Sequence, residues 1–86
     1  MYRYGIEIRR WASPRLYSMY RVYIAGEGIV GMLSSGKEYG YSEAENTIRR
    51  MLEDQGVRFA SKGEFWKFLL NSCHIVEYYV RRRKDL

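Results

Sequence analysis

The chain has 86 residues, enough for one small domain but too few for both a sizeable core and a deep substrate cleft. Hydrophobic residues make up 47% of it and charged residues 29%, a balance that excludes an intrinsically disordered chain. The 15 Lys and Arg residues against 10 Asp and Glu residues give a formal net charge of +5, which favours an acidic partner such as nucleic acid or an acidic protein surface.

The single cysteine and the first residues of the chain bear on its compartment. Cys73 has no second cysteine for an internal disulfide, which is typical of a reducing environment. The charged residues Arg3, Glu7, Arg9 and Arg10 make the start of the chain unlike a signal peptide. No apolar run reaches the roughly 18–20 residues that a membrane-spanning helix requires. We therefore expect a cytoplasmic protein.

The first half of the chain predicts three strands. Residues 2–11 alternate with a period of two, which is typical of an antiparallel strand with one solvent-facing side. After a turn at Pro14, residues 16–24 carry apolar side chains on both faces, as a central strand or a partner-binding strand does. A glycine-rich hairpin turn leads to a third strand over residues 29–34, and a loop is expected over residues 36–41. The positions that share one face are Tyr2, Tyr4, Ile6 and Ile8 in the first strand and Leu16, Tyr20, Val22 and Ile24 in the second.

A first helix follows these strands. Ser42, with Glu45 three residues later, forms a capping box, which is a signature of a helix N-terminus. An apolar stripe at helical spacing continues from there, and Gly56 is the expected residue at the C′ position that ends the helix. Residues 57–59 are expected to be extended, either as a short strand or as a connector.

A second helix and a final strand complete the chain. Ser61 and Glu64 form another capping box, and the helix that they open is apolar around more than half of its girth. We therefore expect it to be the more deeply buried of the two helices. Residues 74–80 return to strand character, and residues 81–86 form a charged C-terminal tail.

The predicted element order is β-β-β-α-(β)-α-β. Because strands and helices are segregated rather than strictly alternating, this order predicts a single small α+β domain over residues 1–86. The expected architecture is a mostly antiparallel sheet of three to five strands with two helices packed on one face.

Residues suited to catalysis or cofactor binding do not form a known constellation. Cys73 and His74 are adjacent at a helix–strand junction, so their side chains should diverge, and Cys73 continues the apolar stripe of the second helix. Residues 26–31 match the pattern G-x-G-x-x-G, but strand-like residues follow where a dinucleotide site requires a helix. One cysteine and one histidine cannot make a closed zinc site without carboxylates. We therefore expect no enzyme activity, no cofactor and no metal.

Arginine and aromatic residues are interleaved along the predicted strands. A sheet face that presents them can bind single-stranded nucleic acid, because rings stack on bases and guanidinium groups contact phosphates. Alternatively, Tyr is present as a good strand former and Arg as a residue that tolerates a solvated face. The basic tail could contact phosphates or serve only to keep the chain in solution. The candidate contact residues are Arg3, Arg9, Trp11, Tyr17, Arg21 and Tyr23 on the strands, and Arg81, Arg82 and Arg83 in the tail.

Two functions follow from these patterns. The first hypothesis is a small basic binding module that engages nucleic acid or a ribonucleoprotein through the Arg and aromatic sheet face and the basic tail. The alternative is a protein–protein interaction module, because the chain has more apolar and aromatic surface than two helices can cover. Such a module would be a small inhibitor or adaptor of the kind that mobile elements encode, or a homodimer that pairs through an edge strand.

Overall fold

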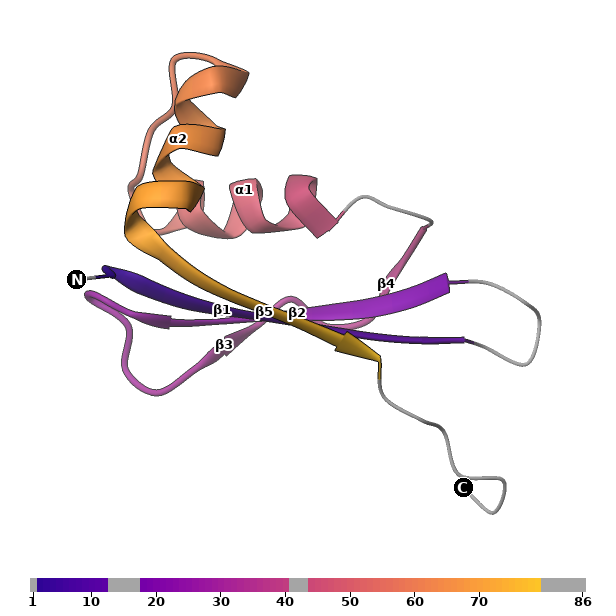
Figure 1. Cartoon of the computed structure of the whole chain (residues 1–86). Helices are drawn as coiled ribbons and strands as arrows, with labels where there is room; N and C mark the ends of the chain where they lie inside the picture. The colour runs from indigo at the N-terminus through magenta and orange to yellow at the C-terminus, as the bar shows by residue number, and fades with distance from the viewer. Residues whose placement is uncertain (1, 13–17, 41–43, 80–86) are drawn as a thin grey trace.

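Two helices cover one face of a five-stranded mixed sheet in the computed structural model of the chain, which describes residues 2–12, 18–40 and 44–79 (Figure 1). The strands are β1 (Tyr4–Ala12), β2 (Ser18–Gly26), β3 (Leu33–Ser34), β4 (Glu38–Tyr39) and β5 (Cys73–Tyr79). The helices are α1 (Ala44–Asp54) and α2 (Lys62–Ser72). The predicted α+β class, with both helices on one face of the sheet, is confirmed.

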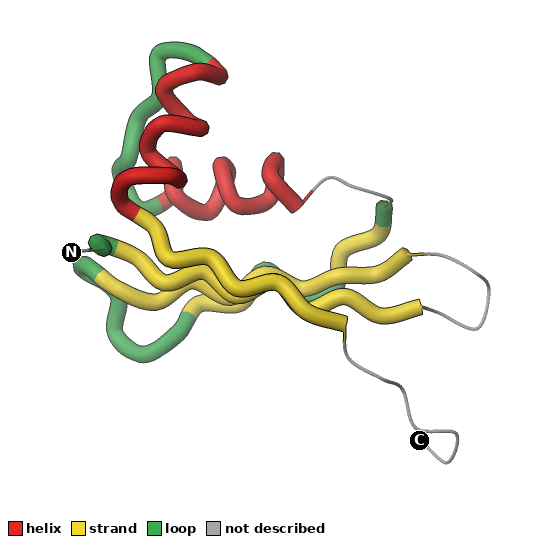
Figure 2. Tube along the Cα trace, viewed as in Figure 1, coloured by secondary structure: helices red, strands yellow, loops and turns green. Residues whose placement is uncertain are grey.

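The long strands β1 and β2 form an antiparallel pair at the centre of the sheet. On its other side β1 pairs with β5 in parallel, so the sheet is mixed rather than purely antiparallel. The order across the sheet is β3-β2-β1-β5, and the short strand β4 also pairs with β2. Figure 2 shows both described helices on one side of the sheet. The opposite side, which no described helix covers, is called the open face below.

The register of β1 and β2 turns their apolar residues toward the helices. Ile6 of β1 lies opposite Ile24 of β2. Two positions further along, Ile8 lies opposite Val22, and the side chains of both pairs are buried. Since neighbouring side chains of a strand point to opposite faces, the intervening residues lie on the open face. The predicted shared faces are confirmed at these positions, whereas Tyr2 is exposed.

Helix α1 packs over β2 and carries the apolar stripe that the sequence predicts. Its buried residues are Ala44, Thr47, Ile48, Met51 and Leu52. The hydroxyl groups of Thr47 and Tyr20 are hydrogen-bonded at 2.9 Å, so each gives the other a buried partner. The helix ends as predicted, because Gly56 has a φ of +91° and the Val57 N–H donates to the Leu52 carbonyl, as in a Schellman motif.

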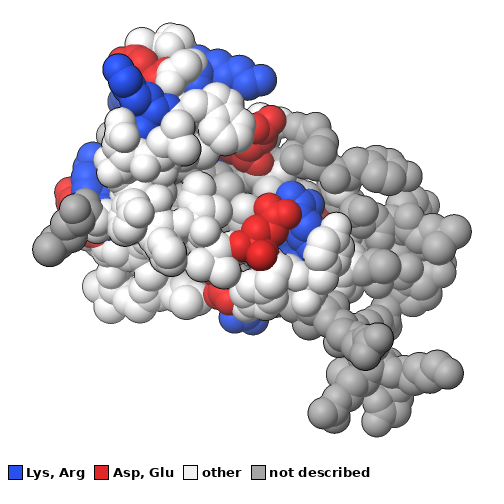
Figure 3. Space-filling view, in the orientation of Figure 1, with Lys and Arg blue, Asp and Glu red and all other residues white. Residues whose placement is uncertain are grey.

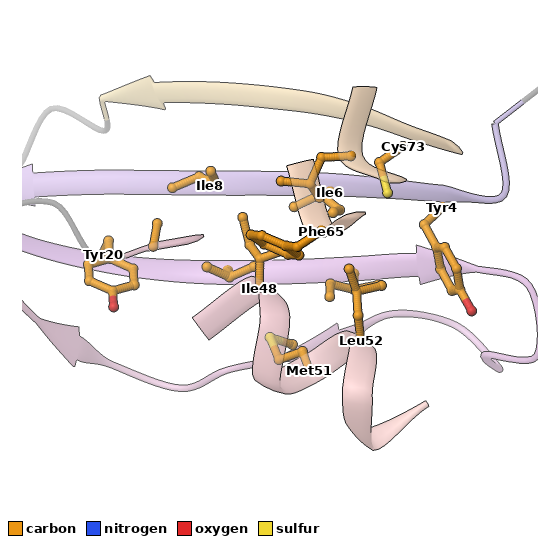
Figure 4. Packing of buried hydrophobic residues seen from close by; sticks show 13 residues of the cluster. Tyr4, Ile6, Ile8, Tyr20, Ile48, Met51, Leu52, Phe65 and Cys73 are labelled. Carbon is orange, nitrogen blue, oxygen red and sulfur yellow. The ribbon is translucent and has the colours of Figure 1, made fainter. Parts of the chain in front are cut away.

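The core lies between the sheet and the two helices, and Figure 4 shows side chains from both layers meeting there. Helix α2 contributes less to it than the sequence predicts, because only Phe65 and Leu69 of that helix are buried. The expectation that α2 is the more deeply buried helix is wrong. Figure 1 shows the reason: α2 rises from the start of β5 at one end of the sheet, so that only one side of it faces the core.

The predicted N-cap Ser61 is confirmed at the start of α2, whereas the Glu64 carboxylate bonds one residue before the position that a capping box uses. The Glu64 N–H donates to the Ser61 hydroxyl at 3.2 Å, and the Glu64 carboxylate accepts from the Ala60 N–H at 2.7 Å. Residues 57–59 form a connector rather than a strand. The predicted cap residue Ser42 and the predicted strand residue Leu16 lie outside the described residues.

The third strand is shorter than predicted, and β4 was not predicted. The expected strand over residues 29–34 is reduced to its last two residues, because Gly31 takes a φ of +74° and Val30 is fully exposed. Strand β4 lies within the expected loop over residues 36–41 and pairs with β2 at Met19 and Tyr20. Two residues of backbone pairing need no hydrophobic alternation, so this strand has no sequence signature.

Candidate functional site

The open face brings together the candidate contact residues of β1 and β2. Arg9 lies opposite Arg21, and Trp11 lies opposite Met19. Tyr23 follows Arg21 by two positions and therefore shares its face. The structure thus places these predicted residues on one surface, where each of the predicted side chains is partly exposed.

The other candidate contact residues lie elsewhere. Arg3 precedes β1 and is exposed at the end of the sheet. Tyr17 and the tail residues Arg81, Arg82 and Arg83 lie outside the described residues, so their contact roles stay predictions.

A hydrogen-bonded network joins β1 and β5 on the open face. The Nε and Nη2 atoms of Arg9 donate to the two carboxylate oxygens of Glu7, each at 3.2 Å. The hydroxyl of Tyr78 donates to the same carboxylate. The Arg9 guanidinium also lies over the ring of Tyr23, 4.4 Å from its centroid. Because the Glu7 carboxylate already accepts two hydrogen bonds from the Arg9 guanidinium, fewer N–H donors of Arg9 are available to an external phosphate.

This network shifts the pKa values of its members. The hydrogen bonds from Tyr78 and Arg9 lower the pKa of the Glu7 carboxyl. The hydrogen bond to Glu7 raises the pKa of the Tyr78 hydroxyl, because loss of the phenolic proton would place two negative oxygens together. The pKa of Arg9 is raised as well, because its hydrogen bonds to the Glu7 carboxylate stabilise the charged guanidinium. Glu7 is therefore ionised in the folded protein over a wider pH range than in the unfolded chain.

We expect Glu7→Gln to lower stability only where Glu7 is ionised. A carboxyl whose pKa is lower in the folded state stabilises the fold above its unfolded pKa, and the contribution is lost as the pH falls through the folded pKa. Urea denaturation should thus show a deficit in the free energy of unfolding of the variant at neutral pH that shrinks in acid. The control Glu53→Gln removes the partly exposed ion pair with Arg49 and should change stability little. A deficit that is independent of pH would contradict the assignment.

Other described arginines are also paired with acidic side chains. Arg3 contacts Glu27 at 3.0 Å, and Arg10 contacts Glu77 at 2.9 Å, which links β1 to β5 on the helix side of the sheet. The arginines of α1 form similar pairs. Among the described residues, much of the positive charge is therefore matched locally rather than gathered on one face.

Arg21 differs, because none of the ion pairs of the described residues includes it. Its Nη1 atom lies 3.4 Å from the Tyr23 hydroxyl, and its Nε atom is shielded from solvent without a hydrogen-bond partner. The like charge of Arg9 lies directly across the strands. Arg21 therefore has more donors available to an added carboxylate or phosphate than Arg9, whose guanidinium is already paired with Glu7.

A hollow of about 270 Å³ adjoins the network on the open face. It arises because Gly5 of β1 lies opposite Ala25 of β2, so that two facing positions lack a sizeable side chain. A Cβ atom added at Gly5 would meet nothing within 4 Å. The residues around the hollow are Gly5, Ile6, Glu7, Tyr23, Ala25, Met32, His74 and Val76. Such a hollow can accept one apolar side chain of a partner.

Strand β5 forms an edge of the sheet, and no described strand pairs with its outer side. Cys73 is buried, but every later residue of the strand is exposed, including Val76 at 43% and Tyr79 at 78%. The strand contains neither Pro nor Lys, residues with which natural edge strands discourage pairing. β5 therefore presents unpaired backbone donors and acceptors with apolar side chains on both sides of them.

The helix side of β5 is open as well, because α1 lies over β2 rather than β5 (Figure 1). A notch of about 220 Å³ remains between the helices and β5. Trp66 of α2 and Ile75 of β5 line it, and Trp66 is 41% exposed. Figure 3 shows a largely uncharged surface where α2 meets the start of β5, with charged side chains at the outer end of α2 and farther along β5.

The residues of the β5 edge were missing from the sequence-based candidates. The sequence predicts the strand, but it does not show that one of its edges stays unpaired. A signal was present, because Ile75 and Tyr79 on one side and Val76 and Tyr78 on the other make both faces apolar. In a strand with few buried residues, this pattern indicates contact with a partner.

Cys73 and His74 do not form a catalytic pair. Cys73 pairs with Tyr4, and its side chain lies on the helix side of the sheet. His74 pairs with Gly5, and its side chain lies on the open face, so the two side chains diverge as predicted. Burial raises the pKa of the Cys73 thiol to about 11, which leaves it protonated and a weak nucleophile at neutral pH. Within the described ranges, no group of three or more His, Cys, Asp and Glu side chains is placed to hold a metal ion.

Comparisons with protein-family models, curated proteins and solved structures found no match to the chain. Neither of the two described helices has the length and apolar character that crossing a membrane requires.

Proposed function

We propose that the chain is a protein–protein interaction module that binds its partner along the outer edge of β5. The observation that carries the proposal is the exposure of β5 on both faces and along an unpaired edge. A strand added to such an edge gains main-chain hydrogen bonds, and pockets for its alternate side chains supply specificity.

The surroundings of β5 supply such pockets on both faces. The hollow beside Val76 opens on one face, and the notch beside Ile75 opens on the other. Successive side chains of an added strand point to opposite faces, so they approach both recesses in turn. The hollow lies over Gly5 of β1, on the far side of β5, so that only a long side chain would reach it. The largely uncharged surface over α2 and the start of β5 extends the same contact area, and depletion of charge is typical of the centre of protein interfaces.

Binding of nucleic acid through the open face and the tail stays a prediction. Arg3, Arg9 and Arg10 each have a carboxylate of the chain as partner. The described residues therefore give this hypothesis less support than the β5 edge gives to protein binding.

The proposal is tested by selecting peptides from a random library on the immobilised chain. We expect selected peptides to have alternating apolar residues and to bind at least tenfold more weakly to Val76→Lys, since a lysine on an edge strand opposes pairing. The matched control is Val30→Lys, which makes the same change at a fully exposed position between β2 and β3. Peptides that bind the wild type and both variants equally would contradict the proposal.

A further inference from the structure

We infer that the partner of β5 is a second copy of this chain, paired with the first strand to strand about a two-fold axis. The inference rests on the proposed binding role of β5, and it identifies the occupant of that edge. Two-fold pairing presents the same surface from both copies, so β5 must be complementary to itself.

The geometry of the sheet restricts how two β5 strands can pair. An axis perpendicular to the sheet makes the strands antiparallel and keeps both helical layers on the same side. Residues that face each other across an antiparallel pair lie on the same face, so β5 positions pair odd with odd and even with even. The axis must therefore pass through a residue position of β5 rather than between two residues.

One register satisfies this restriction over the whole strand. With Val76 on the axis, all seven residues of β5 have a partner in the other copy. His74 then lies opposite Tyr78 on the open face, and Cys73 lies opposite Tyr79 on the helix side. A shift of the axis to Ile75 or Glu77 would leave two residues at one end of each strand without partners.

Charge selects the same register. Glu77 is the only acidic or basic residue of β5 apart from the exposed imidazole of His74, and it is paired with Arg10 of β1. With Val76 on the axis, Glu77 lies opposite Ile75 of the other copy, so the two Glu77 side chains do not face each other. With the axis at Glu77, two carboxylates would face each other, which is destabilising across a strand pair.

The opposite edge of the sheet is not equipped for the same pairing. It consists of β3 and β4, each of two residues, and very short strands are a common means of blocking edge association. β5 offers a continuous edge of seven residues instead. A dimer through β5 would form one continuous sheet with the short strands at its two outer limits.

The first test compares the mass of the full chain with that of two charge variants by light scattering, from about 1 to 100 μM. We expect a dimer for the wild type. Val76→Lys alone and Val76→Glu alone should be monomers, because each places like charges on the axis. An equimolar mixture of the two variants should form a heterodimer, since the charges then complement each other, and this recovery excludes misfolding as the cause of dissociation.

The second test locates the axis by crosslinking. In a Cys73→Ala background, Val76→Cys should form a disulfide-linked dimer on mild oxidation, since directly opposed residues have Cα atoms about 4.5–5.5 Å apart and disulfides span about 4.4–6.8 Å. His74→Cys in the same background is the control. Its two copies would lie four residues apart along the strands, roughly 14 Å, and should not crosslink.

The outcomes separate this inference from the proposed function. A wild type that is monomeric over the whole range, or charge variants that still dimerise, would overturn the pairing of two β5 strands. Equal crosslinking of both cysteine variants would overturn the register. The peptide experiment gives an independent result: peptides sensitive to Val76→Lys would keep β5 as a binding edge for another protein even if the chain does not pair with itself.

Discussion

Leu52→Ala is expected to lower the free energy of unfolding by about 2–5 kcal/mol, the range for a large aliphatic residue truncated in a packed core. Leu52 is 0% exposed and lies on α1, among the labelled core residues of Figure 4. Truncation removes its buried methyl groups and leaves a cavity that the rigid sheet below can fill only in part. Since natural domains are stable by about 5–15 kcal/mol, the loss should be large enough to shift the urea midpoint clearly.

The same substitution at Leu70 is the matched control. Leu70 is 77% exposed on α2, so Leu70→Ala removes little buried surface and should change stability by less than about 0.5 kcal/mol. Equilibrium unfolding in urea, followed by tryptophan fluorescence, compares both variants with the wild type. A loss at Leu70 as large as that at Leu52 would show that α2 packs differently from the described arrangement.

Gly26→Ala is expected to destabilise the fold by about 2–5 kcal/mol, which combines steric overlap with the cost of a left-handed backbone. Gly26 has a φ of +137° at the end of β2. A Cβ atom there would lie 2.9 Å from the Cα of Tyr4 and would overlap the carbonyl oxygen of Arg3. Both atoms belong to the main chain at and just before the start of β1, so neither can move aside without separating β1 from β2.

Gly28→Ala separates the two causes. Gly28 also has a positive φ, +77°, but a Cβ atom there would meet nothing within 4 Å. Its substitution should therefore cost only the backbone term, about 1–2 kcal/mol. Thermal and urea unfolding of both variants measure the difference. If Gly28→Ala were as damaging as Gly26→Ala, close approach of β1 would not be the reason for glycine at position 26.

The elements with strong local signals could be predicted from the sequence. The alternation around Ile6 and Ile8 identified β1 and its buried face, and the cap at Ser61 and the glycine at position 56 marked helix ends. These features depend on neighbours along the chain. The limited burial of α2 could not be predicted. Apolar residues surround more than half of this helix, but that pattern does not show that the helix lies at one end of the sheet. β4 could not be predicted, because a strand of two residues is too short to show an alternation of apolar side chains.

The candidate site could be predicted only in part. The period of β1 and β2 correctly placed Arg9, Arg21 and Tyr23 on a common face. The sequence did not show that Tyr78 would donate to Glu7, the partner of Arg9, because that contact needs β5 beside β1. The edge position of β5 also depends on sheet order, which no periodicity along a single strand reveals.

The parallel pairing of β1 with β5 has a consequence for the order in which the protein forms during synthesis. Tyr4 pairs with Cys73, so the central strand β1 is synthesised well before its second neighbour β5. At about 5–20 residues per second, the edge of β1 that β5 later covers stays unpaired in the growing chain for several seconds. Pairing of β5 with this edge requires a contact between distant parts of the chain, which is entropically costly and slow. Completion of the sheet is thus a late event, and nascent chains are open to mispairing until it occurs.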